Sequence, residues 1–237
     1  HGFSLVWVGW EFDVRCANGL MGISVPSAQG VNGRVWGDFT PSNTNEKQTV
    51  GDLVGYAPAD PAAADSTLTV RDHYWDRPTP IARTRWRFIS AGAGPPRLAL
   101  DGGFEPGRMY EVSYVAMGAR LVGAGLAAIR DAASAFRYRT DLPIRGRWAL
   151  GYGFSQDGRF LRQFLYDGFN VYERDRVVFD GIWSHIAGAA RGSFNERFGM
   201  PAAGSVLLTP IRFPFTTDEQ SFDGERGSLL QRYRPDQ

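Results

Sequence analysis

The spacing of apolar residues predicts a strand that turns directly into a helix, past the middle of the chain. Residues 148–154 are apolar except at their glycine and tyrosine positions, and a run this short is typical of a buried strand. From Gly158 onward the apolar residues lie on one face of a helix, at Phe160, Leu161, Phe164 and Leu165. Ser155 therefore occupies the predicted turn between the two elements.

Strands and helices alternate on either side of this turn. Residues 3–8 are almost continuously apolar, as in a parallel strand covered on both faces, and residues 109–116 predict another strand. Between residues 122 and 136 apolar positions recur at intervals of three and four, which predicts an amphipathic helix of about four turns. A further strand is predicted at residues 176–179. This order predicts an α/β fold: a mostly parallel sheet with right-handed crossovers and helices on both faces.

The region between the first two of these strands follows a different pattern. Short apolar segments alternate with Gly, Pro, Asn and Asp, and the dipeptide Asn32-Gly33 favours a hairpin turn. The segments lie at residues 22–26, 31–39, 68–71, 85–89 and 97–100. They predict a β-rich, antiparallel insertion over residues 15–107, with residues 1–14 and 108–237 forming the α/β core. Three roles fit the insertion: shaping a substrate wall, mediating contacts, or packing alone.

Ser155 has the setting that a nucleophilic serine needs. A tight turn from strand to helix pushes the hydroxyl out of the sheet, and the helix N-terminus directs backbone N–H groups at developing negative charge. Gly153 permits the close passage of backbone that such a turn requires. The second glycine is Gly158, and Asp157 takes the usual glycine position, so the motif is G-x-S-x-x-G in place of G-x-S-x-G. The same residues fit an ordinary helix N-cap serine, with Asp157 as favourable first-turn charge.

Residues 153–162 have the sequence Gly-Phe-Ser-Gln-Asp-Gly-Arg-Phe-Leu-Arg, and further characteristic segments lie at residues 164–170, 178–181 and 186–198. Together they resemble a largely uncharacterised family of α/β-hydrolase-domain proteins, in which the motif usually reads G-x-S-Q-S-G-R. The altered glycine spacing is thus shared with the family, and only Asp157 is particular to this chain. The resemblance implies an α/β-hydrolase-type sheet and a serine hydrolase with Ser155 as its nucleophile.

The resemblance also bears on the extent of the chain. Proteins of this family carry sequence before the strand predicted at residues 3–8, and their acid and histidine lie beyond the segment at residues 195–198. By this comparison the chain looks like a partial copy whose α/β core is incomplete at both ends. We therefore expect a further segment or a second chain to complete the catalytic site.

Two backbone N–H groups are expected to form the oxyanion hole. In α/β-hydrolases one belongs to the residue after the nucleophile, and the other comes from a loop after an earlier strand. These positions correspond to Gln156 and to the loop Gly9–Trp10, from which we choose Trp10 as the donor. Trp10 fits equally well as a core anchor beside a simple glycine turn.

A serine nucleophile also needs a base and an acid that orients the base. His185 is the only histidine after Ser155, and Asp180 follows the strand predicted at residues 176–179, so these two are the candidates within the chain. Because they are close in sequence, the alternative is that Asp180 and His185 only hold the loop together through hydrogen bonds.

Composition excludes several other kinds of site and partner. The net charge of +1 gives no general attraction for nucleic acid or an anionic membrane, and no apolar run reaches the roughly 20 residues that span a bilayer. The single Cys16 excludes an internal disulfide and a multi-cysteine metal site. Neither the acidic and histidine residues within 72–76 nor the pair Glu11 and Asp13 has the spacing of a metal site. We expect no cofactor and no metal, and the sequence leaves localisation open.

These features predict the hydrolysis of a carboxylic ester, with a small-molecule ester as substrate, through an acyl-enzyme on Ser155. The alternative from another class is a non-catalytic binding or scaffold protein on the same fold. A third interpretation is a carbohydrate- or lipid-binding module that uses exposed aromatic residues of the β-rich insertion.

Overall fold

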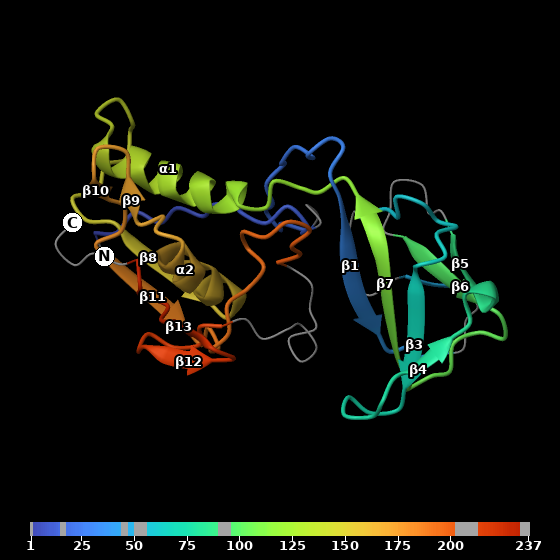
Figure 1. The fold of residues 1–237 in the computed structure, drawn as a ribbon. Coiled ribbons are helices and arrows are strands. Elements are labelled where there is room, and N and C mark those ends of the chain that lie inside the picture. The colour runs from blue at the N-terminus through green and yellow to red at the C-terminus, as the bar shows by residue number, and fades with distance from the viewer. Residues whose placement is uncertain are drawn as a thin grey trace. The chain divides into compact units, whose positions relative to one another are not determined.

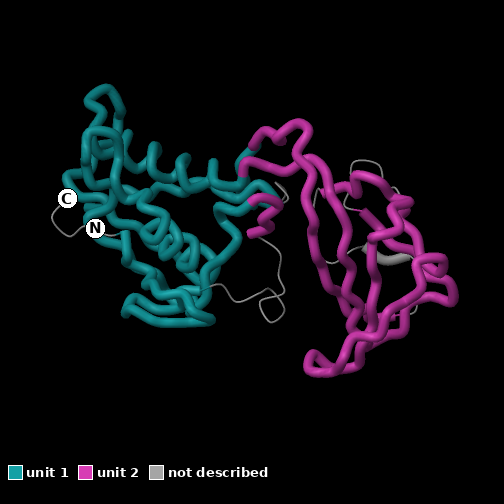
Figure 2. Tube along the Cα trace, viewed as in Figure 1, with its two compact units in different colours: residues 1–24, 122–196, 210–237 teal, residues 25–121, 197–209 magenta. Residues whose placement is uncertain are grey.

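The computed structural model describes residues 2–14, 18–43, 47–49, 56–89, 96–201 and 213–232. His1 and Cys16 lie outside these residues. The chain forms two compact units (Figure 2), and it passes from the first to the second and back twice. The first unit contains residues 1–24, 122–196 and 210–237, and the second contains residues 25–121 and 197–209.

The first unit combines two α-helices with a small parallel sheet (Figure 1). The helices are α1 (Ala124–Tyr138) and α2 (Gln156–Tyr166), and the sheet pairs β8 (Leu150–Phe154) with β11 (Gly181–His185). Two antiparallel hairpins accompany them: β9 (Val171–Tyr172) with β10 (Arg176–Val177), and β12 (Gln220–Phe222) with β13 (Glu225–Gly227). The amphipathic helix predicted between residues 122 and 136 is confirmed as α1, and the predicted strand-to-helix junction is confirmed as β8 and α2.

The hydrophobic core of the first unit lies between the two helices. Its buried members are Leu126 of α1, Phe160, Leu161 and Phe164 of α2, and Val178 and Phe194. The α2 members share one face because residues spaced by three and four positions meet on a helix. Burying one such side chain contributes roughly 1.5–3 kcal/mol. This cluster therefore fixes α2, and with it the end of β8, against the rest of the unit.

The mostly parallel sheet of the prediction is not found, because β8 and β11 are the one parallel pair among the described strands. Helices do not cover both faces of this pair either. In β8, Gly151 and Gly153 are buried while Leu150, Tyr152 and Phe154 on the opposite face are more than half exposed. Within the described part of the chain, that second face stays uncovered.

The strand predicted at residues 3–8 is also wrong. These residues pair with no strand in the described structure, and Phe3, Leu5 and Trp7 are each more than 70% exposed. The strand predicted at residues 176–179 is reduced to Arg176–Val177 in the hairpin β9–β10. A continuous apolar run shows that a segment favours burial, but it does not provide the neighbouring strand that a parallel strand must pair with.

The second unit is built from two antiparallel sheets. One has the order β1 (Asn32–Phe39), β7 (Met109–Met117), β3 (Thr67–Arg71) and β4 (Thr79–Ile81). The other has the order β2 (Lys47–Thr49), β6 (Arg97–Leu100) and β5 (Trp86–Ile89), and the short 3₁₀ helix η1 (Arg83–Arg85) precedes β5. Ring contacts such as Phe88 with Tyr114, 5.0 Å between centroids, join the two sheets in a common core. The antiparallel β-rich region of the prediction is thus present, although residues 22–26 form no strand.

The strand at residues 109–116 was predicted in the parallel core, and this is wrong. It is β7, which pairs antiparallel with both β1 and β3 at the centre of the second unit. Its side chains alternate between buried and partly exposed, with Tyr110, Val112, Tyr114 and Ala116 buried. Alternation of this kind marks a strand with one covered face, which is typical of an antiparallel sheet.

The boundaries of the units differ accordingly from the predicted ones. The second unit begins at residue 25 and continues to residue 121, where the prediction placed the insertion at residues 15–107. It also takes up residues 197–209, which the prediction gave to the α/β core. Because β7 pairs with β1 and β3, the segment around it belongs with the β-rich unit. No helix among the described residues is long and apolar enough to cross a membrane.

Candidate active site

Ser155 has the backbone conformation of a strained turn. It lies between the end of β8 and the start of α2 with φ 52° and ψ −109°, a conformation that side chains with a Cβ rarely adopt. Such a conformation costs on the order of 1–3 kcal/mol and persists only where the surroundings impose it. Its hydroxyl makes no capping hydrogen bond to α2, and the residue is exposed. An ordinary N-cap serine has an extended backbone and a capping hydroxyl, so the N-cap interpretation does not describe this residue.

Two glycines impose the turn by letting backbone approach backbone. A Cβ added to Gly153 would lie 2.6 Å from the nitrogen of Gly158 and closer still to the carbonyl of Asp157. A Cβ added to Gly158 would lie 2.9 Å from the oxygen of Gly153 and 3.0 Å from that of His185. The predicted need for small residues on both sides of Ser155 is therefore confirmed, with the second glycine one position later than in G-x-S-x-G.

The first turn of α2 directs its positive end at the serine. Arg159 N donates to the carbonyl of Ser155 at 3.0 Å, so the helical ladder begins at this residue. The N–H groups at a helix start have no partner within the helix and attract negative charge. Gln156 is the first residue of α2, which is the position expected of an oxyanion donor.

The loop at Gly9–Trp10 lies against this first turn. Trp10 donates its indole Nε1–H to Asp157 Oδ1 at 3.0 Å, and its ring packs on Phe160 with centroids 4.1 Å apart. A Cβ on Gly9 would lie 2.8 Å from the nitrogen of Gly22, so glycine is required there as well. The structure thus brings Trp10 to the turn at Ser155, and the same contacts make it a core anchor. Its role as an oxyanion donor stays a prediction.

Glu11, next to Trp10, is a residue of this site that sequence reasoning missed. Its side chain is buried, with only 9% exposed, and the side chain of Gln156 hydrogen-bonds to its carboxyl. Burial raises the pKa of Glu11 from 4.5 to about 7, and the hydrogen bond from Gln156 opposes this shift. The nearby carboxylates of Asp13 and Asp157 add to the rise. The available signal was its place directly after the predicted oxyanion loop.

His185 meets Ser155 through its backbone. Its carbonyl accepts a hydrogen bond from Ser155 N at 2.9 Å, which continues the pairing of β8 with β11. Its ring stacks on that of Phe154, with centroids 5.4 Å apart, on the uncovered face of the sheet. In the described structure no hydrogen bond joins this ring to the Ser155 hydroxyl or to a carboxylate.

Asp180, which the sequence predicts as the catalytic acid, has its carboxylate engaged with residues away from Ser155. It immediately precedes β11, and its carboxylate accepts hydrogen bonds from Arg137 Nη2 at 2.8 Å and from Ala149 N at 2.9 Å. Ala149 is at the start of β8, so Asp180 lies roughly 20 Å along the strand direction from Ser155 at about 3.3 Å per residue. The sequence predicts Asp180 at the carboxyl end of a strand, but in the structure it precedes the strand β11. Asp180 joins α1 to the sheet.

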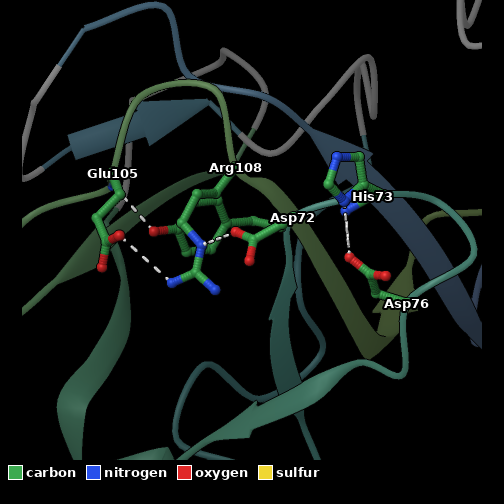
Figure 3. Close-up of polar contacts among 6 residues, drawn as sticks. Asp72, His73, Asp76, Glu105 and Arg108 are labelled. Carbon is green, nitrogen blue, oxygen red and sulfur yellow. Dashed lines mark hydrogen bonds and ion pairs between the residues drawn. The ribbon is translucent and has the colours of Figure 1, made fainter.

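The acidic and histidine residues of the turn after β3 are engaged with neighbours in the second unit (Figure 3). Arg108 Nε donates to Asp72 Oδ1 at 2.7 Å, and His73 Nδ1 lies 3.0 Å from Asp76 Oδ2. A second guanidinium nitrogen of Arg108 reaches Glu105 at 3.3 Å. Among the described residues, no three His, Cys, Asp or Glu side chains are grouped so that they could hold a metal ion.

A cavity of about 570 Å³ in the first unit reaches the first turn of α2 at Asp157. Its walls come from the segment at residues 4–11, from α1 and from the start of β8, and Glu11, Asp157 and Phe160 also line it. Most of the lining side chains are apolar, and those of α1 (Ile129, Ala132, Ala133 and Phe136) carry no charge.

A family model described as an alpha/beta hydrolase domain matches residues 66–229, and this range includes Ser155, both helices and most of the second unit. The chain belongs to the α/β-hydrolase domain family. No curated protein and no solved structure matches it. Membership makes the chain a hydrolase-superfamily member, and it is consistent with a small-molecule substrate.

Replacing Gly153 tests the close approach at the turn. Gly153→Ala is expected to lower the free energy of unfolding by about 1–3 kcal/mol, because the new Cβ has no space against the first turn of α2. The matched control is Gly151→Ala in the same strand, whose Cβ would sit at an ordinary 3.5 Å from Ile182 and Phe179. Urea unfolding followed by circular dichroism measures both. Equal urea midpoints for the two variants would show that the first turn of α2 leaves space for a Cβ at residue 153.

Asp180→Asn tests whether this carboxylate is structural. The ion pair with Arg137 is partly buried, so we expect a loss of about 1.5–3 kcal/mol in the free energy of unfolding. Asp141→Asn, which breaks an exposed pair with Arg139, serves as the control and is expected to change nothing measurable. The rate at which a fluorophosphonate probe labels the folded protein should be the same for Asp180→Asn and the wild type. A large drop in that rate at unchanged stability would restore Asp180 as the catalytic acid.

Proposed function

We propose that the protein is a serine hydrolase that cleaves carboxylic esters, with Ser155 as the nucleophile. The observation that supports this best is the strained backbone of Ser155 between β8 and α2, which Gly153 and Gly158 permit and which leaves the residue exposed. Strained backbone conformations are concentrated at functional sites, because they cost free energy and a serine with only a structural role does not need one. Membership of the α/β-hydrolase family supports the same assignment.

In the proposed reaction the Ser155 oxygen attacks the ester carbonyl, and its proton passes to a base. The carbonyl oxygen becomes an oxyanion, which the backbone N–H groups of Gln156 and Trp10 would stabilise by on the order of 3 kcal/mol each. Collapse breaks the bond to the alcohol, which leaves with the proton, and an acyl-enzyme remains on Ser155. Water then attacks the acyl carbon, so that the acid leaves and the hydroxyl is restored.

We infer that the base that takes the proton of Ser155, and the acid that orients this base, lie in a further segment or a second chain. What supports this is the geometry of His185, whose ring stacks on Phe154 while only its backbone reaches Ser155. Asp180 is engaged with Arg137 at the far end of β8. A serine hydroxyl without a base is a poor nucleophile, so residues 1–237 alone should turn over a simple aryl ester slowly.

Labelling with a fluorophosphonate probe tests the nucleophile. The intact protein is expected to be labelled, because the serine oxygen attacks phosphorus and fluoride leaves, and Ser155→Ala is expected to lose at least 90% of the label. Ser221→Ala, an exposed serine on β12, is the matched control and should be labelled like the wild type. In-gel fluorescence and the mass of the labelled peptide give the readout. Equal labelling of the Ser155→Ala variant would refute the nucleophile, and no labelling of the intact protein would favour a binding or scaffold protein.

His185→Ala separates a base within the chain from one outside it. Since the His185 ring makes no hydrogen bond to Ser155 in the described structure, we expect the labelling rate of the intact protein to stay within about threefold of the wild type. Rates are compared at pH 7.5 on protein shown to be folded by circular dichroism. A loss of tenfold or more would identify His185 as the base and remove the need for a further segment.

A further inference from the structure

Two consecutive residues of the segment at 9–11 bind two consecutive residues of α2. Trp10 donates to Asp157 at 3.0 Å, and Gln156 hydrogen-bonds through its side chain to Glu11. Both partners lie in the first turn of α2, directly after Ser155. The Trp10 contact fixes the segment against the helix. The second contact, between Glu11 and Gln156, involves the residue whose N–H is proposed to bind the oxyanion.

The carboxyl of Glu11 is short of partners. Its Oε1 atom is buried, and among the described residues no hydrogen-bond partner reaches it. Within the described ranges, the charged groups that act on it are Asp13 on its own segment and Asp157 on α2, and both are carboxylates. The residues of α1 and β8 that line the same cavity are uncharged. An ionised Glu11 would therefore be a buried negative charge among negative charges, which is costly.

We propose that Glu11 is a positioning residue for the acylation step: its carboxyl holds the side chain of Gln156, and in its neutral form it keeps a buried negative charge away from the oxyanion site. This inference rests on the proposed function of Ser155. Glu11 does not touch the reacting atoms, and it acts through the first residue of α2.

The charge of Glu11 opposes catalysis because the transition state is itself negative. Below pH 7 the folded protein holds Glu11 neutral, since its pKa is raised from 4.5 to about 7. As the pH rises through 7, the carboxyl ionises beside the helix end that should stabilise the oxyanion. The rate of attack by Ser155 should then fall. The folded state holds the Glu11 proton more tightly than the unfolded state does, so this contribution to stability is fully present below pH 4.5 and is lost as the pH rises from 4.5 through 7.

The experiment compares the fluorophosphonate labelling rate of wild type and Glu11→Gln in the intact protein from pH 5.5 to 8.5. The glutamine keeps a hydrogen-bonding group for Gln156 and cannot ionise. Taking the ratio of the two rates cancels the titration of the base, which both proteins share. We expect the ratio of wild type to variant to be close to one at pH 5.5 and to fall three- to tenfold by pH 8.5, with its midpoint near pH 7.

Two further variants separate charge from position. Glu173→Gln removes an exposed carboxylate from the hairpin β9–β10 of the same unit, and its ratio to the wild type should stay constant with pH. Glu11→Leu removes both the charge and the hydrogen bond, and it should be labelled at least threefold more slowly than Glu11→Gln at every pH. Circular dichroism at each pH shows that the variants are folded.

The outcomes distinguish this inference from the proposed function. If Ser155→Ala loses the label while the ratio of wild type to Glu11→Gln stays flat, Ser155 is the nucleophile and the inference about Glu11 is wrong. Equal labelling of Glu11→Leu and Glu11→Gln would refute the positioning of Gln156. If Ser155→Ala is labelled like the wild type, the proposed function fails, and the inference fails with it.

Discussion

The first unit depends on the closeness of two backbone segments, the last residues of β8 and the first turn of α2. Gly153 and Gly158 have no space for a Cβ, and this approach forces Ser155 into a left-handed conformation. The buried face of α2, with Phe160 and Phe164 in the core, supplies the packing that offsets the strain. The start of α2 thus carries both features: the exposed serine precedes it, and its buried residues belong to the core cluster.

The second feature that shapes the site is the segment at residues 9–11, which crosses the first turn of α2 without forming a strand. Trp10 ties it to the helix by packing and by a hydrogen bond, and Glu11 adds a buried carboxyl at the same place. A helix N-terminus attracts negative charge, so acidic side chains gather there readily. At an oxyanion site the same attraction becomes competition, because a fixed carboxylate and the reacting oxygen would share one positive field.

Local periodicity predicted the parts of the site that local sequence controls. The junction of β8 and α2 could be predicted because the spacing of apolar residues changes at Ser155. The close approach of Gly153 and Gly158 could also be predicted, because it involves only backbone atoms of residues near in sequence. Pairing could not be predicted in the same way. β7 was placed in the wrong sheet although its alternating burial favours an antiparallel partner, and Asp180 was placed at the wrong end of a strand. The burial of Glu11 depends on segments far apart in sequence, so its local sequence shows only that it follows the predicted oxyanion loop.

The uncovered face of β8 and β11 bears on how the polypeptide behaves while it folds. Tyr152 and Trp183 pack edge to face at 5.4 Å and remain largely exposed, and in the described part of the chain each of the two strands has one edge without a partner. An apolar face beside an open strand edge is a template for pairing with another chain. Dilute refolding should therefore give more monomer than concentrated refolding, because this face then meets other chains less often.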